Sequence, residues 1–324
     1  MTEPVPSVEQ AAEQLGAIRD QMSKVILGQE DVIEHVLAAF VAGGHVLLEG
    51  VPGLGKTLLV LAMARSIGGT FSRIQFTPDL MPSDVTGHAM FDQTASTFRI
   101  RKGPVFAHLL LADEINRAPA KTQAALLEVM QERQVTIEGE AFTLEPPFMA
   151  LATQNPVEQE GTYPLPEAQL DRFLLKVRLG YPTLDAETAI VTAVTQGRVG
   201  DGLDVSRIQA VVDTAGARGL QRAAAAVTVD ERVIRYAVDI VRATRVRQGV
   251  VLGAGPRGGI ALVRVARGMA LLGGRDFVTP DDIKRIAVPA LRHRVAVAPE
   301  LEIEGLHADD VLRSIIDSVE APRS

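Results

Sequence analysis

Residues 50–57 read GVPGLGKT and directly follow the apolar run HVLLE at 45–49. The loop has the spacing GxxxxGKT, and a helix-forming run at 58–66 comes directly after it. Its glycines let the backbone present N–H groups to phosphate oxygens, and the next helix N-terminus adds positive partial charge. The stretch predicts a phosphate-binding loop in which Lys56 reaches the β- and γ-phosphates and Thr57 ligates Mg²⁺. A Gly-rich turn without a ligand is the alternative, and the strand–loop–helix context argues against it.

The nucleotide contacts predicted in and next to this loop are Gly50, Val51, Pro52, Gly53, Leu54, Gly55, Lys56, Thr57 and Leu58. The bound group is predicted to be ATP or ADP with Mg²⁺.

The composition limits the class of protein. The chain has 324 residues, of which 47% are hydrophobic, and this length fits about two domains. A formal net charge of −7 and an aromatic content of 4%, without Trp, argue against a basic or base-stacking nucleic-acid binder. The absence of cysteine excludes disulfides, iron–sulfur clusters and thiolate zinc sites, and the histidines form no HxxxH pair for a metal.

No targeting segment is visible in the sequence. The N-terminus is polar and acidic without a signal-peptide apolar region, and no run approaches ~18 apolar residues. We therefore expect a cytoplasmic protein with no membrane insertion.

Apolar strands alternate with helices in the first part of the chain. Strands are predicted at 45–49, 70–76, 108–112, 148–152 and 174–179, and helices at 8–27, 30–42, 58–66 and 119–134. Continuous apolar strands of this kind predict an α/β fold with a central parallel sheet covered on both faces. Short β-like runs at 88–101 and 134–145 predict two hairpin inserts, for which plain surface decoration is the alternative.

After residue 182 helices dominate. They are predicted at 185–198, 205–217, 230–247, 257–272, 280–292 and 307–319. The chain is thus predicted to divide into a nucleotide-binding domain at 1–182 and a small all-helical domain at 183–324. The Ala- and Arg-rich stretch 215–226 has no functional explanation from the sequence.

Two acidic residues follow the buried strand at 109–112. Asp113 is predicted to hold Mg²⁺ through water beside Thr57, and Glu114 to orient and polarise the attacking water. A charged pair directly after a buried strand is costly unless something binds there. A solvated pair of loop acids is the alternative, and the phosphate loop upstream argues against it.

The next apolar strand ends in the run ATQNP at 152–156. A polar side chain at this point can touch both the γ-phosphate and the attacking water, and Asn155 fits that position. An Asn before Pro is also a common turn former. On spacing alone, both interpretations stay open.

The order of these motifs resembles that of AAA+ ATPases and, more narrowly, the MoxR family. The residues that carry the resemblance are ILGQE at 26–30, GVPGLGKT at 50–57, QFTPDL at 75–80 with PSD at 82–84, LLLADEINRAP at 109–119, ATQNP at 152–156, LPEAQLDRF at 165–173 and GAGPRG at 253–258. The GKT loop is shared by many ATPases. The combination of ADEINRAP, ATQNP and LPEAQLDRF is much more specific. The match spans about residues 8 to 318.

The resemblance implies roles for further residues. Gly28 and Gln29 would lie against the adenine and ribose, and Asn155 would be the sensor 1 residue. Arg172 would be an arginine finger that enters the neighbouring subunit's site, and Arg257 would be sensor 2, touching the γ-phosphate in cis. The hairpins would be the helix-2 insert and the pre-sensor-1 hairpin, which line the pore of a ring. One departure is Gly255, which stands where the family often has Ser.

The sequence alone leaves two interpretations open for each of two arginines. Arg172 as a surface salt-bridge residue would be worth under ~1 kcal/mol, whereas an arginine finger is worth ~10³-fold or more in rate. Arg117 is a second candidate for contact between subunits, against a structural role beside the acidic strand.

The resemblance implies an ATPase that forms a homo-oligomeric, hexameric ring and remodels or matures a client protein, with a von Willebrand factor A domain protein as partner. A nucleic-acid motor is the rival, supported by Arg99, Arg101 and Lys102 and opposed by the overall acidity. A nucleotide-gated binding module with little turnover is the third possibility.

Overall fold

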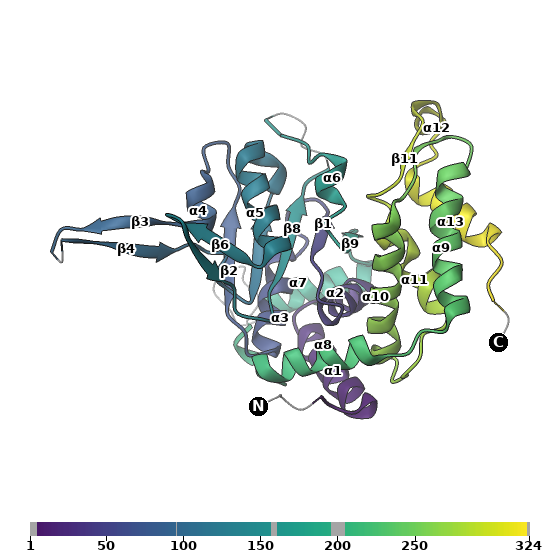
Figure 1. Ribbon diagram of the computed structural model, residues 1–324. Coiled ribbons are helices and arrows are strands. Elements are labelled where there is room, and N and C mark those ends of the chain that lie inside the picture. The colour runs from purple at the N-terminus through teal and green to yellow at the C-terminus, as the bar shows by residue number, and fades with distance from the viewer. Residues whose placement is uncertain (1–4, 95, 157–160, 196–204, 323–324) are drawn as a thin grey trace.

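The computed structural model describes residues 5–94, 96–156, 161–195 and 205–322. Its centre is a five-stranded parallel sheet (Figure 1). In spatial order the strands are β2 (Phe71–Gln75), β5 (Leu109–Asp113), β8 (Met149–Gln154), β1 (Val46–Glu49) and β9 (Leu175–Arg178). Gln75 pairs with Asp113, and Glu49 pairs with Gln154, so the carboxyl ends of four strands meet at one edge. The predicted parallel sheet is confirmed.

Helices cover both faces of the sheet because successive strand residues point to opposite sides. Leu109 and Leu111 of β5 pack into a core with α1 (Val8–Ser23), α2 (Glu30–Val41) and α3 (Lys56–Ser66). Leu110 and Ala112 pack into a second core with α5 (Ala120–Glu132). The buried strands therefore read as continuous apolar runs in the sequence.

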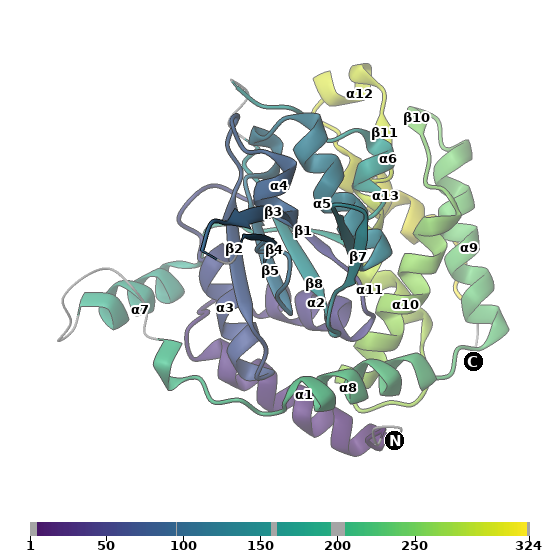
Figure 2. The ribbon, with the colours of Figure 1, turned by 60° about the vertical axis from the view of Figure 1, so that its left-hand side comes forward.

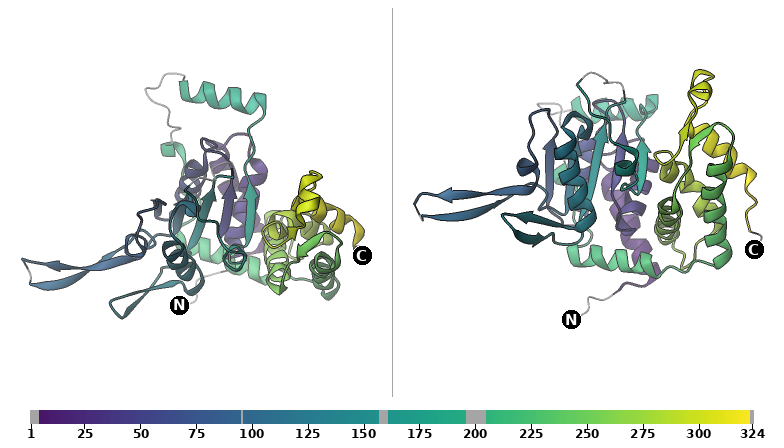
Figure 3. Two further views of the ribbon diagram at one scale, coloured as in Figure 1. Left: turned by 90° about the horizontal axis from the view of Figure 1, so that it is seen from above. Right: turned by 45° about the horizontal axis from the view of Figure 1, so that its top comes forward.

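Both predicted hairpins are present, except that Ala95 lies outside the described residues. The first consists of β3 (Gly87–Asp92) and β4 (Thr97–Lys102), and the second of β6 (Gln134–Ile137) and β7 (Glu140–Thr143). Figure 3 shows both hairpins leaving the body of the molecule on the same side. The short helices α4 (Pro82–Thr86) and α6 (Glu167–Leu170) complete the region around the sheet.

The C-terminal region is predominantly helical, as predicted. Its helices are α7 (Leu184–Thr195), α8 (Thr214–Ala226), α9 (Glu231–Val246), α10 (Pro256–Leu272), α11 (Pro280–Leu291), α12 (Pro299–Ile303) and α13 (Ala308–Ser318). A short antiparallel pair, β10 (Val250–Leu252) with β11 (Ala296–Val297), is added to the predicted helices. The last three residues of the helix predicted at 185–198 lie outside the described residues.

The helix predicted at 205–217 is wrong. Only a 3₁₀ turn at Val205–Arg207 forms, and helix α8 begins after Asp213, whose side chain accepts a hydrogen bond from the Gly216 N–H. The Val211 N–H donates to the Ser66 carbonyl at 2.8 Å, which holds the chain against the end of α3. Such a contact between distant segments is not visible in local periodicity.

Helix α8 gives the stretch 215–226 a structural explanation. Ala217, Leu220 and Ala224 are buried in the core that α8 shares with α1, α2 and α10. Because α8 packs on helices from both parts of the chain, the division after residue 182 stays a prediction. Within the described ranges, no helix is long and apolar enough to cross a membrane.

His45 directly precedes β1 and is buried between β8 and α5. Its Nδ1 accepts a hydrogen bond from the Ala150 N–H at 2.9 Å, and its Nε2 lies 3.0 Å from the Met130 carbonyl oxygen. This pairing requires a neutral ring with the proton on Nε2. Burial lowers the pKa of His45 to about 4.

We expect acid to destabilise the protein through His45. Its folded pKa of about 4 lies below the ordinary value of 6.5, so the unfolded state binds the proton first. The free energy of unfolding should fall by about 3 kcal/mol as the pH drops from 6.5 to 4. His45→Gln keeps one acceptor and one donor and cannot titrate, so urea unfolding at the two pH values should show a smaller loss. Equal losses in the two proteins would contradict the assignment.

Candidate nucleotide-binding site

The phosphate loop has the backbone that the sequence predicts. Gly53 and Gly55 have φ angles of +85° and +77°, in the left-handed region that favours glycine. A Cβ atom at either position would meet nothing within 4 Å, so these two glycines serve the backbone conformation rather than close packing. Helix α3 begins at Lys56 directly after Gly55. The loop thus leads directly into a helix N-terminus, whose free N–H groups and positive partial charge suit a phosphate group.

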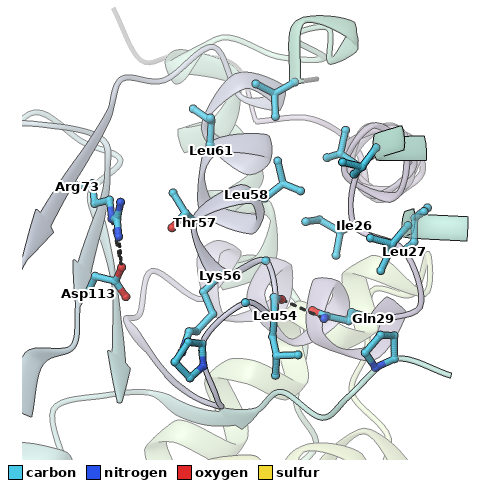
Figure 4. Close-up of a pocket in the computed structure, with 18 of the residues that line it drawn as sticks. Ile26, Leu27, Gln29, Leu54, Lys56, Thr57, Leu58, Leu61, Arg73 and Asp113 are labelled. Atoms are coloured by element: carbon cyan, nitrogen blue, oxygen red, sulfur yellow. Dashed lines mark hydrogen bonds and ion pairs between the residues drawn. The ribbon is translucent and has the colours of Figure 1, made fainter. Parts of the chain in front are cut away.

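A cavity of about 600 Å³ opens beside the loop. One end is polar, and Figure 4 shows Lys56, Thr57, Arg73 and Asp113 there. The other end is apolar and is lined by Val25, Ile26, Leu27, Leu58, Leu61, Pro182, Ile190, Val194 and Val205. Figure 2 shows α7, which carries two of these side chains, standing out beside α3. A polar end for phosphates and an apolar end for a base suit a nucleotide.

Of the two neighbours Gly28 and Gln29, only Gln29 reaches the cavity. Gln29 lines the cavity and donates from Nε2 to the Leu54 carbonyl at 3.2 Å. Gly28 does not line it, in contrast to the contact that the resemblance implied. Gly28 has a φ of +71°, and a Cβ there would lie 2.5 Å from that of Ala186, so this glycine allows α7 to pack closely. Gly50 and Val51 are also absent from the cavity wall.

The Lys56 ammonium donates to the Gly50 carbonyl at 2.7 Å, across its own loop. Burial lowers the pKa of Lys56 from its usual value, and the Asp113 and Glu114 carboxylates act in the opposite direction. The ammonium therefore lies in the field of both acids, within the cavity where phosphates would bind.

Asp113 ends β5 and is 9% exposed. Its Oδ2 accepts hydrogen bonds from Arg73 Nη2 at 2.6 Å and Nε at 3.2 Å, and its Oδ1 accepts one from Thr153 Oγ1 at 2.6 Å. Both carboxylate oxygens therefore have partners within the protein.

Glu114 has a left-handed backbone, with a φ of +56° and a ψ of +49°. This conformation is strained for a residue other than glycine, and the Glu114 N–H is held by Thr153 Oγ1 at 2.8 Å. The side chain accepts from Gln75 Nε2 at 2.7 Å and pairs with Arg117 Nε at 3.1 Å. The turn directs the second acid into the same cavity as the first.

Thr153→Val should destabilise the protein by about 2 kcal/mol. Thr153 is fully buried, and its hydroxyl bridges Asp113 and Glu114. Valine has the same shape but leaves the buried carboxylate oxygen and the N–H without this partner. Urea unfolding measures the loss, and Thr153→Ser, which keeps the hydroxyl, should lose much less. Equal stability of the two variants would show that the bridge does not matter.

The polar end of the cavity fits Mg²⁺ bound together with a nucleotide. Thr57 and Asp113 provide a hydroxyl and a carboxylate there, and Mg²⁺ prefers such oxygen ligands. Among the described residues, no cluster of three or more acidic, His or Cys side chains could hold a metal alone. Phosphate oxygens would have to complete the coordination, which is the usual arrangement for Mg²⁺.

The other residues with predicted roles lie outside this cavity. Asn155 directly follows β8, between the ends of β1 and β5, and is 7% exposed, but it does not line the cavity. Arg172 and Arg257 line a second cavity of about 250 Å³, together with Arg264 and Arg294. Arg117 pairs with Glu114 of its own chain.

Arg257, for which the resemblance implied a γ-phosphate contact in cis, lines the second cavity and not the one beside the phosphate loop. Arg257 Nη1 lies 3.5 Å from Asp171 Oδ2, and Arg294 Nε lies 2.7 Å from Asp171 Oδ1. Helix α10 packs closely on α2, where a Cβ at Gly268 would lie 2.7 Å from the Ala38 carbonyl oxygen. This packing places the first turn of α10 beside Asp171 instead of beside the phosphate loop.

Sequence reasoning missed three side chains that hold the acidic pair. Arg73 and Gln75 are two residues apart on β2, and Gln75 pairs with Asp113, so all three side chains lie on the same face of the sheet. That spacing at the end of a short strand was a usable signal. Thr153 gave no comparable signal, because its two partners depend on how β8 and β5 pair. The apolar wall formed by α7 was also missed.

The sheet order, the phosphate loop, the acidic strand end and the helical C-terminal region define an AAA+ nucleotide-binding protein. The model of the "ATPase family associated with various cellular activities (AAA)" matches residues 45–175, and that of the AAA lid domain matches residues 242–315.

Three similar proteins identify the family within the AAA+ class. The chain is 46% identical to the protein YeaC of Bacillus subtilis, over 95% of each chain. It is 42% identical to the chaperone MoxR1 of Mycobacterium tuberculosis, over 94% of this chain and 81% of that one. A Cytophaga hutchinsonii protein of known crystal structure matches with a TM-score of 0.89 and 40% identity, over 97% of this chain and 96% of that one. The chain therefore belongs to the MoxR family of AAA+ ATPases.

Proposed function

We propose that the protein hydrolyses ATP with Mg²⁺ and uses the energy to remodel or mature a client protein. The observation that carries the ATPase proposal is the single cavity that brings together Lys56 and Thr57 from one segment and Asp113 and Glu114 from another. In this proposal the phosphate loop and Lys56 bind the phosphates, and Thr57 and Asp113 hold Mg²⁺, which supplies charge neutralisation when bound. Glu114 orients the attacking water and accepts its proton.

The second cavity supports a role for an adjoining subunit. Four arginines line it with Asp171 as the only acidic side chain among the described lining residues. The Arg172 guanidinium makes no hydrogen bond or ion pair within the described part of the chain. An excess of positive charge at one place suits the phosphates of a nucleotide held by a neighbouring copy. We propose that Arg172 and Arg257 both act on the neighbour's site, with Asn155 as the sensor in cis.

A contact of this head-to-tail kind forms a ring when the rotation between successive copies closes. We therefore propose a homo-oligomer that forms a hexameric ring, located in the cytoplasm. The two hairpins would face the pore, and a von Willebrand factor A domain protein would be the partner.

The first hairpin favours a polypeptide over a nucleic acid as client. Phe91 pairs with Phe98 across the strands, with ring centroids 5.2 Å apart and exposures of 50% and 73%. Arg99 and Arg101 alternate with Phe98 along β4 and therefore point to the opposite face. A nucleic-acid strand needs aromatic and basic side chains on the same surface. Lys102 shares the Phe98 face, but it pairs with Gly87 at the base of the hairpin, and its Nζ lies 4.9 Å from the Phe106 ring centroid. An exposed aromatic pair with both arginines on the opposite face instead suits an extended segment of a protein.

Measurement of phosphate release from ATP tests the function. The wild type should turn over ATP only with Mg²⁺, whereas Lys56→Ala should bind no nucleotide. Stimulation by DNA that is lost as salt rises would favour the nucleic-acid motor. Nucleotide binding without turnover, even with a partner present, would favour a nucleotide-gated module.

A further inference from the structure

Arg73 lies at the acidic end of the nucleotide cavity. It belongs to none of the sequence motifs, and none of them predicts a role for it. It belongs to β2, one of the two edge strands of the sheet, and Figure 4 shows its side chain reaching toward Asp113 of the neighbouring strand. Two of its nitrogens donate to Asp113 Oδ2, at 2.6 and 3.2 Å. With Thr153 on Oδ1, the carboxylate is satisfied before any cation arrives.

The same guanidinium is linked to the second acid. Arg73 Nη2 also donates to Gln75 Oε1 at 3.0 Å, and Gln75 Nε2 donates to Glu114 Oε2 at 2.7 Å. One cationic side chain thus connects both acids at the end of β5, so its departure would change the surroundings of both.

Arg73 and a divalent cation compete for Asp113, whether the cation binds the carboxylate directly or through water. Both need the lone pairs of the same carboxylate, and a dication beside a guanidinium would be repelled by its charge. The Arg73 side chain is 47% exposed and can swing into solvent. Because the Arg73 end of this ion pair is open to solvent, its charge is screened, which lets a bound metal displace it.

We propose that Arg73 is an internal counter-ion that replaces the metal at Asp113 in the metal-free site and is displaced when the metal binds with nucleotide. This inference rests on the proposed function of the cavity. It makes Arg73 a positioning residue that sets how strongly nucleotide binding depends on metal. In the metal-free protein the positive charge of Arg73 also screens the acids from the nucleotide phosphates. Arg73 therefore strengthens the binding of metal-free nucleotide relative to the binding of the nucleotide–metal complex.

The test compares ADP affinity with and without metal, so that hydrolysis plays no part. For each protein the dissociation constant of ADP is measured by calorimetry in excess chelator and in saturating Mg²⁺. Arg73→Gln should raise the ratio of the chelator value to the Mg²⁺ value by about 3- to 10-fold over the wild type, because it removes a weak ion pair and its screening. Arg73→Lys keeps the charge but loses the two-pronged contact, and should raise the ratio less.

Arg235→Gln is the matched control, because this arginine lies on α9 with its side chain 81% exposed and only a 3.9 Å contact to Asp239. Its ratio should equal that of the wild type. An unchanged ratio in both Arg73 variants would overturn the inference, and a lower ratio would show that Arg73 supports the metal complex instead. A wild type that binds no ADP under either condition would refute the proposed function itself. If Arg73→Gln does not fold, Arg73→Lys alone decides the question by the same ratio.

Discussion

Glu114→Gln is expected to bind ATP normally and to release phosphate about 10³-fold more slowly than the wild type. Glutamine has the same size and can still accept the hydrogen bond that Gln75 donates to the side chain. It cannot take a proton from water at neutral pH. The loss should therefore appear in turnover and not in nucleotide affinity, which separates this residue from Lys56.

The fold should tolerate this change. The ion pair of Glu114 with Arg117 is partly exposed, at 22% and 39% of the two side chains, so its loss costs under ~1 kcal/mol. The left-handed backbone is held by Thr153, which the substitution does not touch. Phosphate release and ATP binding are measured together, with Glu13→Gln on the exposed side of α1 as control. Turnover of Glu114→Gln at the wild-type rate would show that another group accepts the proton.

The same variant offers a way to find the client. A site that holds ATP without consuming it should keep the assembled protein in one state, and a client held in that state can be purified with it. Comparison with Lys56→Ala, which should bind neither nucleotide nor client in this way, separates specific capture from background.

The sequence predicted the parts of the site that local patterns determine. The phosphate loop, the acidic strand end and the five strands have strong local signals, because burial on both faces demands continuous apolar runs. The order of the strands brought Lys56, Asp113 and Glu114 to one cavity, as their positions after strands implied. The family relationship, suggested by motifs, is confirmed by the relatives.

Packing between distant segments decided the features that the sequence did not predict. Gly28 faces Ala186 rather than the cavity, because α7 packs against the turn before α2. Arg257 lies beside Asp171, because α10 is fixed along α2. Arg73 reaches Asp113 only because β2 pairs with β5. In each case the neighbour is remote in sequence, and no periodicity of the local residues records it.

Arg172→Ala is expected to lower ATP turnover by about 10³-fold while leaving nucleotide binding and folding intact. The guanidinium lines the second cavity and makes no hydrogen bond or ion pair to any described part of its own chain. Its removal should therefore cost little stability. Phosphate release, ATP affinity and urea unfolding measure the three properties, and Arg313→Ala on α13, an exposed arginine paired with Asp310, serves as control.

Mixing two inactive variants tests whether Arg172 acts between subunits. Arg172→Ala supplies an intact phosphate loop, and Lys56→Ala supplies an intact Arg172. In a randomly mixed ring made from equal amounts, half of the subunits have a working loop, and half of those have a neighbour with the arginine. About one quarter of the wild-type rate should return, because a head-to-tail contact places one subunit's residue in the next subunit's site. A mixture no more active than the average of its two components would mean that Arg172 does not complete a neighbouring site.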